Sequence, residues 1–280
     1  MNSKLKGFPS CWVVNLEESL DRREYMIGEF ERLGLKYNIC QHKRLEDNQT
    51  LRIIGDQEVL DTLPLGATSS HLLTIKQWYE TTNEDMVAIF EDDCDFSIVE
   101  KWNFTFEEFL SRFGVLWDGL QLCVMHEGFP VMAPRNRLGW DHGLQCYIIT
   151  RDYARKIVNY YFKNDTTIHF RMPYIKFQMP SKWGYHEQKQ YEPTIENVIY
   201  GCGTFYIYPI FNHNVHKFKT TVHSDGRRDL QWVAEHSYNY VNQWWDNRGQ
   251  HATLDQLFDL EWCLPKSSGQ TFGMVLPIDI

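Results

Sequence analysis

The sequence predicts an α/β fold in which helices flank a mainly parallel sheet. Over roughly the first 160 residues, apolar runs of strand length alternate with segments of helical periodicity. The run Met86 to Phe90 is unbroken rather than alternating, as expected of a central parallel strand buried on both faces. This run leads directly into a cluster of carboxylates, and ligands of open parallel sheets bind at the carboxyl ends of the strands.

The first half of the chain consists of repeated strand–helix units. An apolar run at 11–14 precedes a helix over 18–33, in which Met26, Phe30 and Leu33 share one face and Gly34 provides the stop signal. The capping-box spacing of Asp21 and Glu24 supports this helix. The next predicted elements are a strand at 36–41, helices at 65–82 and 106–113, strands at 119–125 and 144–150, and a helix at 151–161.

The second half of the chain does not show this alternation of strands and helices. Residues 162–200 are polar, aromatic and loop-like, the segment TFYIYPIF at 204–211 predicts a late strand, and the tail is rich in Trp and irregular. We therefore predict one α/β domain over 1–226 and an irregular C-terminal extension over 227–280 that packs on the same domain.

Composition narrows the classes of function. The chain has 280 residues, of which 43% are hydrophobic and 15% aromatic, as in a globular protein with a sizeable core. A net charge of −9 argues against nucleic acid as the main partner. Seven cysteines without a C-x-x-C pair indicate a reducing compartment and no structural zinc. We find no signal-peptide or membrane-spanning stretch, so we expect a cytoplasmic protein; the sequence does not indicate its oligomeric state.

The carboxylates after the predicted central strand are Glu91, Asp92, Asp93 and Asp95. Close carboxylates repel one another, so they need a cation between them or open water around them. The spacing of Asp93 and Asp95 allows both to bind one hard cation, Mg²⁺ or Mn²⁺, whose remaining ligands would be substrate phosphates and water. The alternative is a solvated loop in which Asp95 caps the next element. The chain contains neither a P-loop nor a G-x-G-x-x-G dinucleotide fingerprint.

Several blocks, in order over about residues 8–225, resemble glycosyltransferase family 25, which includes bacterial lipooligosaccharide galactosyltransferases and procollagen galactosyltransferases. These blocks are VVNLEESLDRREYM, GATSSHLLTIKQW, VAIFEDDCDF, WDGLQL, GLQCYIITRDYARKIV, TFYIYPIF and HSD. The sequence departs from the family at three positions: Ala67 replaces a usual Cys, Pro64 a usual Glu, and Glu196 in PTIE a usual Asp. These departures affect the acceptor and base assignments and leave the donor site compatible with the family.

The resemblance implies a GT-A-type fold, bound Mn²⁺, and transfer of a hexose from UDP-galactose or UDP-glucose to a hydroxyl acceptor on a glycan or protein. It also implies a donor site formed by Asn15, Leu16, Arg22, Ser70, His71 and Asp92. Most of these residues have ordinary structural alternatives: a turn for Asn15, core for Leu16, a surface charge for Arg22, and a helix N-cap for Ser70 supported by His71.

An inverting transfer needs a base for the acceptor hydroxyl. Glu196 is our first candidate, with Asp141 and Glu187 as rivals. A third metal ligand, after Asp93 and Asp95, is expected among His213, His216 and His223, and we choose His223 because it lies in the HSD block. Two other functions remain open: a metal-dependent nucleotidyltransferase, and a catalytically inactive relative that binds a glycan or a partner.

Overall fold

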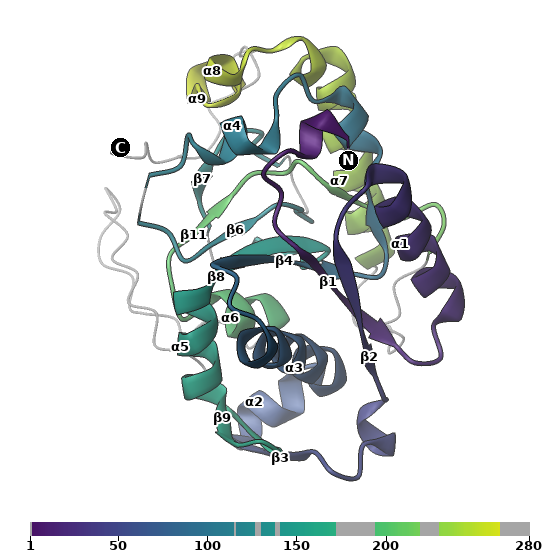
Figure 1. Ribbon diagram of the computed structural model, residues 1–280, viewed down its shortest axis with the longest axis vertical. Helices are drawn as coiled ribbons and strands as arrows, with labels where there is room; N and C mark the ends of the chain where they lie inside the picture. Colours follow the sequence, from purple (N-terminus) through teal and green to yellow (C-terminus); the bar gives the residue numbers. More distant parts are fainter. Residues whose placement is uncertain are drawn as a thin grey trace.

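The computed structural model describes residues 2–114, 116–126, 130–137, 141–171, 194–218 and 230–263. A seven-stranded sheet in the order β2-β1-β4-β8-β6-β11-β7 forms the centre of this part (Figure 1). Its strands are β1 (Cys11–Leu16), β2 (Tyr37–His42), β4 (Met86–Glu91), β6 (Gly119–Gln121), β7 (Arg135–Asn136), β8 (Cys146–Thr150) and β11 (Phe205–Ile207). All except β8 and β7 run in one direction, so the expected mixed α/β fold with a mostly parallel sheet is confirmed.

The neighbours of β4 differ from the prediction on one side. β1 pairs with β4 in parallel, but β8 pairs with it antiparallel, so the sheet reverses next to its central strand. An antiparallel neighbour needs no helical crossover, and the described parts of residues 122–145 contain no helix. Val87 to Phe90 are nevertheless completely buried, because both faces of the sheet are covered.

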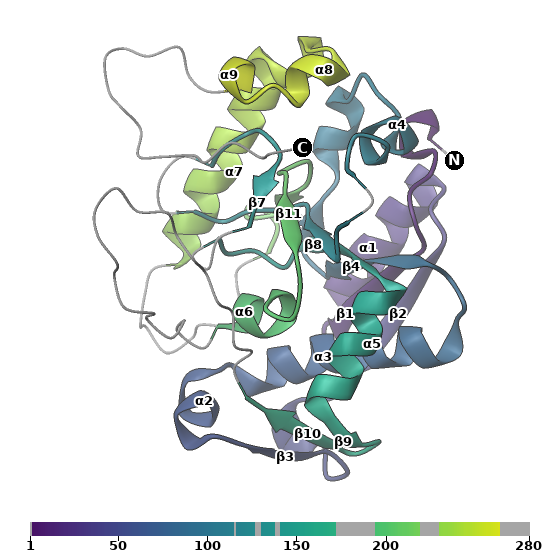
Figure 2. The same ribbon diagram turned by 90° about the vertical axis from the view of Figure 1, so that its left-hand side faces the viewer.

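Two layers of helices cover the sheet (Figures 1 and 2). One face carries α1 (Leu20–Leu33), α4 (Phe106–Leu110), α7 (Leu230–Asn247), α8 (Leu254–Leu257) and α9 (Leu260–Cys263). The other face carries α2 (Gln57–Thr62), α3 (Leu65–Thr81), α5 (Arg151–Tyr161) and α6 (Ile195–Tyr200). Short 3₁₀ helices span Ser3–Leu5, Leu45–Asp47, Ser97–Lys101 and Gly249–His251. In the described residues, no helix is long and apolar enough to span a bilayer.

Local sequence explains the helix that enters the site. Met26, Phe30 and Leu33 of α1 are buried at the predicted i, i+4, i+7 spacing. The helix ends at Gly34, whose φ of 68° lies in the left-handed region that glycine adopts without steric cost.

Two small sheets complete the architecture. β3 (Arg52–Gly55), β10 (Thr167–Phe170) and β9 (Phe162–Asn164) form one of them, below α3 and α5 in Figure 2. β5 (Cys94–Asp95) and β12 (Asn212–His213) form the other, an antiparallel pair directly after the central strand. This pair brings two segments that are distant in sequence to the same end of the sheet.

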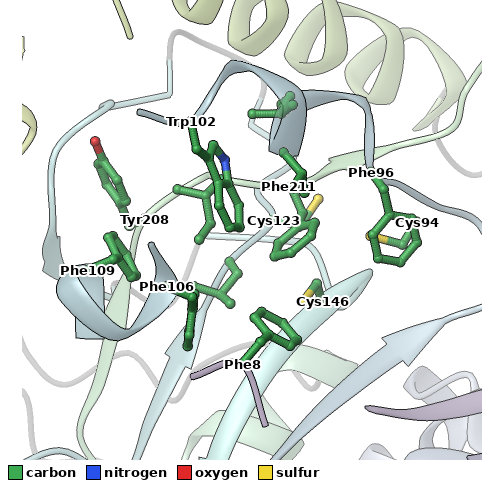
Figure 3. Close-up of a cluster of buried hydrophobic side chains, with 14 of the residues drawn as sticks. Phe8, Cys94, Phe96, Trp102, Phe106, Phe109, Cys123, Cys146, Tyr208 and Phe211 are labelled. Carbon is green, nitrogen blue, oxygen red and sulfur yellow. The ribbon is translucent and has the colours of Figure 1, made fainter. Parts of the chain in front are cut away.

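The residues next to that pair, Phe96 and Phe211, belong to a cluster of buried aromatic side chains (Figure 3). Phe90 at the end of β4, Phe96 after β5 and Phe211 before β12 are fully buried. Their ring centroids are 5.4–5.8 Å apart, within the range of favourable aromatic pairs. Both segments that carry the acidic residues and His213 are therefore anchored in the core.

Two segments predicted to be irregular contain regular structure. Residues 230–247 form the helix α7, because Val233, Ser237, Val241 and Trp245 repeat every four residues and are buried. The Trp and Asn residues between them obscured this period in the sequence. Within 162–200, the structure contains β9, β10 and α6, and residues 172–193 lie outside its described part.

Candidate functional site

The candidate site begins where β1 and β4 end side by side. Asn15 lies near the end of β1, and Asp92 and Asp93 follow β4 directly. The Asn15 Nδ2 donates hydrogen bonds to Asp92 Oδ2 at 2.7 Å and to the Ser19 carbonyl at 3.1 Å. Asn15 is 1% exposed, so it connects the strand end, the start of α1 and the acidic cluster from a buried position. Leu16, the last residue of β1, is only partly buried.

Arg22 provides a buried positive charge between the two aspartates. Its Nη1 lies 2.9 Å from Asp92 Oδ1 and 3.0 Å from Asp93 Oδ2, and its guanidinium lies 5.1 Å from the Phe218 ring centroid. Burial disfavours the charged guanidinium, but the two aspartates outweigh it and raise the Arg22 pKa. The first turn of α1 thus places this arginine inside the cluster rather than on the surface.

His213 is the residue that the sequence analysis did not select. The pairing of β12 with β5 brings its Nε2 to 3.1 Å from Asp93 Oδ2. Burial acts to lower the His213 pKa, but Asp93 dominates and raises it. Burial likewise acts to raise the Asp93 pKa, but His213 and Arg22 lower it. The available signal was that Asn212-His213 follows an apolar strand, just as the acids follow β4; His223, our choice, lies outside the described residues.

The Asp95 carboxylate is engaged locally. Its Oδ1 accepts from the Ser97 amide at 2.9 Å and its Oδ2 accepts from the Ser97 hydroxyl at 2.8 Å. Asp95 thus binds the first residue of the 3₁₀ helix Ser97–Lys101, close to the alternative given above, although the N-cap position itself is Phe96. In contrast, Asp93 Oδ1 is buried and has no hydrogen-bond partner within the described part of the chain.

The donor atoms around Asp93 can be compared with the needs of a divalent cation. The described residues contain no group of three or more His, Cys, Asp or Glu side chains arranged for a metal. Asp93 Oδ2 and His213 Nε2, however, are 3.1 Å apart. Two neighbouring ligands of an octahedral ion with bonds of about 2.1 Å have a separation close to 3 Å. Asp93 and His213 are the described side chains that could hold such a cation, which would replace their present hydrogen bond and could also use the unpartnered Asp93 Oδ1.

His71 and Glu91 form a second polar layer beside the aspartates. His71 is buried, with Nδ1 3.0 Å from the Tyr147 hydroxyl and Nε2 3.3 Å from Glu91 Oε1. Burial lowers the His71 pKa to about 4, so the ring is neutral near pH 7. Burial and the Asp93 charge raise the Glu91 pKa well above its usual value, and Gln145 donates to its other oxygen at 2.9 Å.

Ser70 does not act as an N-cap. It lies inside α3, which begins at Leu65, and its hydroxyl donates to the Gly66 carbonyl at 3.0 Å. Ser70 is buried and lines a small cavity with His42 and Lys43.

Glu196, in the first turn of α6, and His142, which precedes β8, approach each other. Glu196 Oε1 accepts from the Gly143 amide at 3.1 Å and lies 3.5 Å from His142 Nδ1. Burial acts to raise the Glu196 pKa, but His142 and backbone amides lower it to about 2. Glu196 in turn raises the His142 pKa. Glu196, our first candidate for the base, thus interacts with His142, which the sequence analysis did not consider.

Asp141 is part of a buried ion pair with Arg135. It is fully buried, and the Arg135 guanidinium binds both its oxygens, at 2.7 and 2.5 Å. A carboxylate held in this way has no surface to offer an acceptor, so the geometry speaks against Asp141 as a base. Its rival Glu187 lies outside the described residues.

An open groove of about 410 Å³ lies at the ends of β1 and β2, on the Asn15 side of the cluster. It is lined by Glu17, Glu18, His42, Lys43, Arg44 and Asp47. It is open to solvent, and its lining is polar and charged. The groove and the acidic cluster lie at the same end of the sheet, and they share no lining residue.

Comparisons with known proteins do not identify a family for this chain. No protein-family model matches the chain, and no curated protein matches it. Among solved structures, A197 from STIV is similar over 73% of this chain and 84% of its own, at 10% identity and a TM-score of 0.38. HddC from Yersinia pseudotuberculosis is similar over 57% and 68%, at 8% identity and a TM-score of 0.27. Scores this low carry no functional argument, and the resemblance to glycosyltransferase family 25 stays a prediction.

Proposed function

We propose that this chain is a metal-dependent glycosyltransferase of the GT-A type, which moves a hexose from a UDP-sugar to a hydroxyl group of a glycan or protein. One observation carries the proposal: Asn15, Arg22, Asp92, Asp93 and His213, from four separate segments, meet in a buried cluster at the carboxyl ends of β1 and β4. Even a paired cluster of buried charges costs free energy to desolvate, and the carboxyl ends of the strands are where α/β folds bind ligands.

The residues of the cluster would have two different roles, metal binding and the positioning of carboxylates. Asp93 and His213 would hold Mn²⁺ or Mg²⁺, which when bound stabilises the negative charge of the departing diphosphate. Asn15 and Arg22 hold the carboxylates of Asp92 and Asp93 in place by direct hydrogen bonds. Because these supporting groups are themselves buried, the acidic oxygens are already positioned before the donor arrives.

The groove beside the cluster suits the nucleoside half of the donor. Of its lining residues, Lys43 and Arg44 are cationic, whereas Glu17, Glu18 and Asp47 are anionic. A mixed lining of this kind suits the hydroxyls of a ribose and the polar edge of a base rather than the phosphates. The phosphates would then lie toward Asp93, one step further along the same edge.

The segment after β1 favours this function over a nucleotidyltransferase. A nucleotidyltransferase usually has a loop rich in Gly, Lys or Arg there, which binds a triphosphate. Here Asn15 and Leu16 are followed by Glu17 and Glu18, which would repel one.

Ligand-induced thermal stabilisation tests the proposal. We expect UDP, UDP-glucose or UDP-galactose with Mn²⁺ to raise the melting temperature, and nucleotides with other bases to have no effect. A ligand at 100 times its Kd stabilises by about 2.7 kcal/mol. Asp93→Asn should abolish this shift, whereas Asp152→Asn, at a side chain that is 80% exposed on α5, should keep it. If no nucleotide shifts the wild type, or if Asp93→Asn responds like the control, the proposed function is wrong.

A further inference from the structure

We propose that His142 is the base that takes the proton from the acceptor hydroxyl, and that Glu196 is its positioning residue; this inference rests on the proposed transferase function. It differs from the sequence-based expectation, in which Glu196 itself is the base.

The position of His142 follows from the reversal of the sheet. Because β8 runs antiparallel to β4, with Phe90 opposite Cys146, the residues that precede β8 lie at the same edge as the acids that follow β4. Glu91 connects the two groups electrostatically, since the charges of both Asp93 and Glu196 act on it. His142 thus lies at the same end of the sheet as the acidic cluster, on the β8 side of β4, whereas the groove lies on the β1 and β2 side.

The backbone of His142 is fixed while its ring is accessible. Its carbonyl accepts from the Met125 amide at 2.8 Å and from Gln121 Nε2 at 2.9 Å. Its side chain is 39% exposed, against 13% for Glu196. A base must reach the proton of an incoming hydroxyl, so of the two side chains the histidine is the accessible one.

Glu196 approaches the ring from one defined side. Its Oε1 lies 3.5 Å from Nδ1 and is held there by the Gly143 amide, the residue next to His142. A carboxylate at one ring nitrogen orients the imidazole and makes the other nitrogen the acceptor of the proton. The contact is long for a hydrogen bond, as is common before substrate is bound.

The charges around His142 agree with this division of roles. Glu196 and Asp141 raise its pKa, whereas burial and Arg137 lower it, and the net effect is a rise. Glu196 itself, with a pKa of about 2, is a weak base near neutral pH. An imidazole that titrates closer to the working pH is the better proton acceptor.

The proposed step balances as follows. The acceptor oxygen forms a bond to the anomeric carbon of the donor hexose while its proton passes to Nε2 of His142. The bond between the anomeric carbon and the phosphate oxygen breaks, and its electron pair leaves with UDP. His142 then carries one positive charge, which the adjacent Glu196 carboxylate stabilises.

Release of UDP with water as the acceptor tests the inference on the full chain without knowledge of the natural acceptor. UDP-glucose and UDP-galactose with Mn²⁺ serve as probes between pH 5 and 9. We expect His142→Gln to lower kcat roughly 100-fold or more. The UDP-induced thermal shift should stay intact, and His142→Asn provides a second variant. His251→Gln, at an exposed residue of the last 3₁₀ helix, is the matched control.

The pH profile separates catalysis from structure. The wild-type rate should fall at acidic pH as His142 becomes protonated, and Glu196→Gln should shift this fall to lower pH because it removes the carboxylate that favours protonation. A purely structural role for Glu196 would reduce the rate without moving the profile, which would overturn the inference. If both His142 variants match the wild type, the inference fails and the proposed function stands; if the wild type neither binds UDP nor releases it, both fail.

Discussion

Replacing Glu196 by glutamine removes one charge from the start of α6 while keeping the shape of the side chain. Glu196 is only 13% exposed, and its pKa is about 2 instead of 4.5. Burial opposes this shift, so the lowering measures how strongly His142 and the Gly143 amide favour the carboxylate. The substitution should therefore destabilise the folded protein by an amount that depends on pH.

The size of the effect follows from the pKa. A lowering from 4.5 to about 2 corresponds to about 3 kcal/mol of folding free energy. Because His142 is 39% exposed, solvent screens part of its charge, and we expect about 2 to 3 kcal/mol. The same contact raises the His142 pKa, so its energy is counted once, for Glu196.

The pH dependence has a definite sign on both sides. A carboxylate with a lowered pKa adds stability that is fully present above pH 4.5 and is lost as pH falls through about 2. A histidine with a raised pKa adds stability that is present below pH 6.5 and is lost as pH rises through its folded value. The difference in stability between wild type and Glu196→Gln should thus be largest between these limits, near pH 5.5, and shrink on either side.

Urea denaturation followed by tryptophan fluorescence at pH 2.5, 5.5 and 8.5 measures this difference. Glu58→Gln, at an exposed residue of α2, is the control and should change stability little at any pH. Equal stability of Glu196→Gln and wild type at pH 5.5, or a difference that grows on acidification, would refute the electrostatic reasoning.

Two further predictions concern the interior. Asp141→Asn should cost about 3 to 5 kcal/mol in urea denaturation, because Arg135 is left as a buried charge without its carboxylate; a loss below about 1 kcal/mol, like that expected of Asp152→Asn, would contradict a structural role. Ellman's reagent should label at most one thiol per native chain, that of Cys202, because the other six cysteines are buried; rapid labelling of two or more would show that the core opens.

Local patterns explain why most of the fold could be predicted. The buried positions of α1, its end at Gly34 and the unbroken run of β4 are all set by residues close in sequence. The antiparallel insertion of β8 could not be predicted, because strand direction depends on the path of the connecting segment and not on the composition of the strand. The helix α7 was missed for a different reason, since its buried period includes Ser237 and is interrupted by polar and aromatic residues.

The residues of the site also fall into a group that could be predicted from the sequence and a group that could not. Asn15, Arg22, Asp92 and Asp93 lie at the ends of predictable strands or the next helical turn, and the structure brings them together. His213 reaches Asp93 only through the pairing of β12 with β5. This pairing joins segments that are distant in sequence, so no local pattern predicts it.

The ion pair of Asp141 and the approach of His142 to Glu196 likewise depend on how loops fold over the strand ends. Sequence proximity gave no indication of which acid is neutralised by an arginine and which one meets a histidine.

The strand order also determines when the fold can be completed during synthesis. β4 lies between β1, which is made before it, and β8, which is made after it, and β6 has to wait for β11. Until those later strands leave the ribosome, apolar strand edges stay open to pairing with other chains. A chain that stops after residue 200 lacks β11, β12 and α7, and we expect limited proteolysis to degrade it while the full chain resists. The acidic cluster is therefore translated early but acquires its histidine partner only after residue 213 has been made.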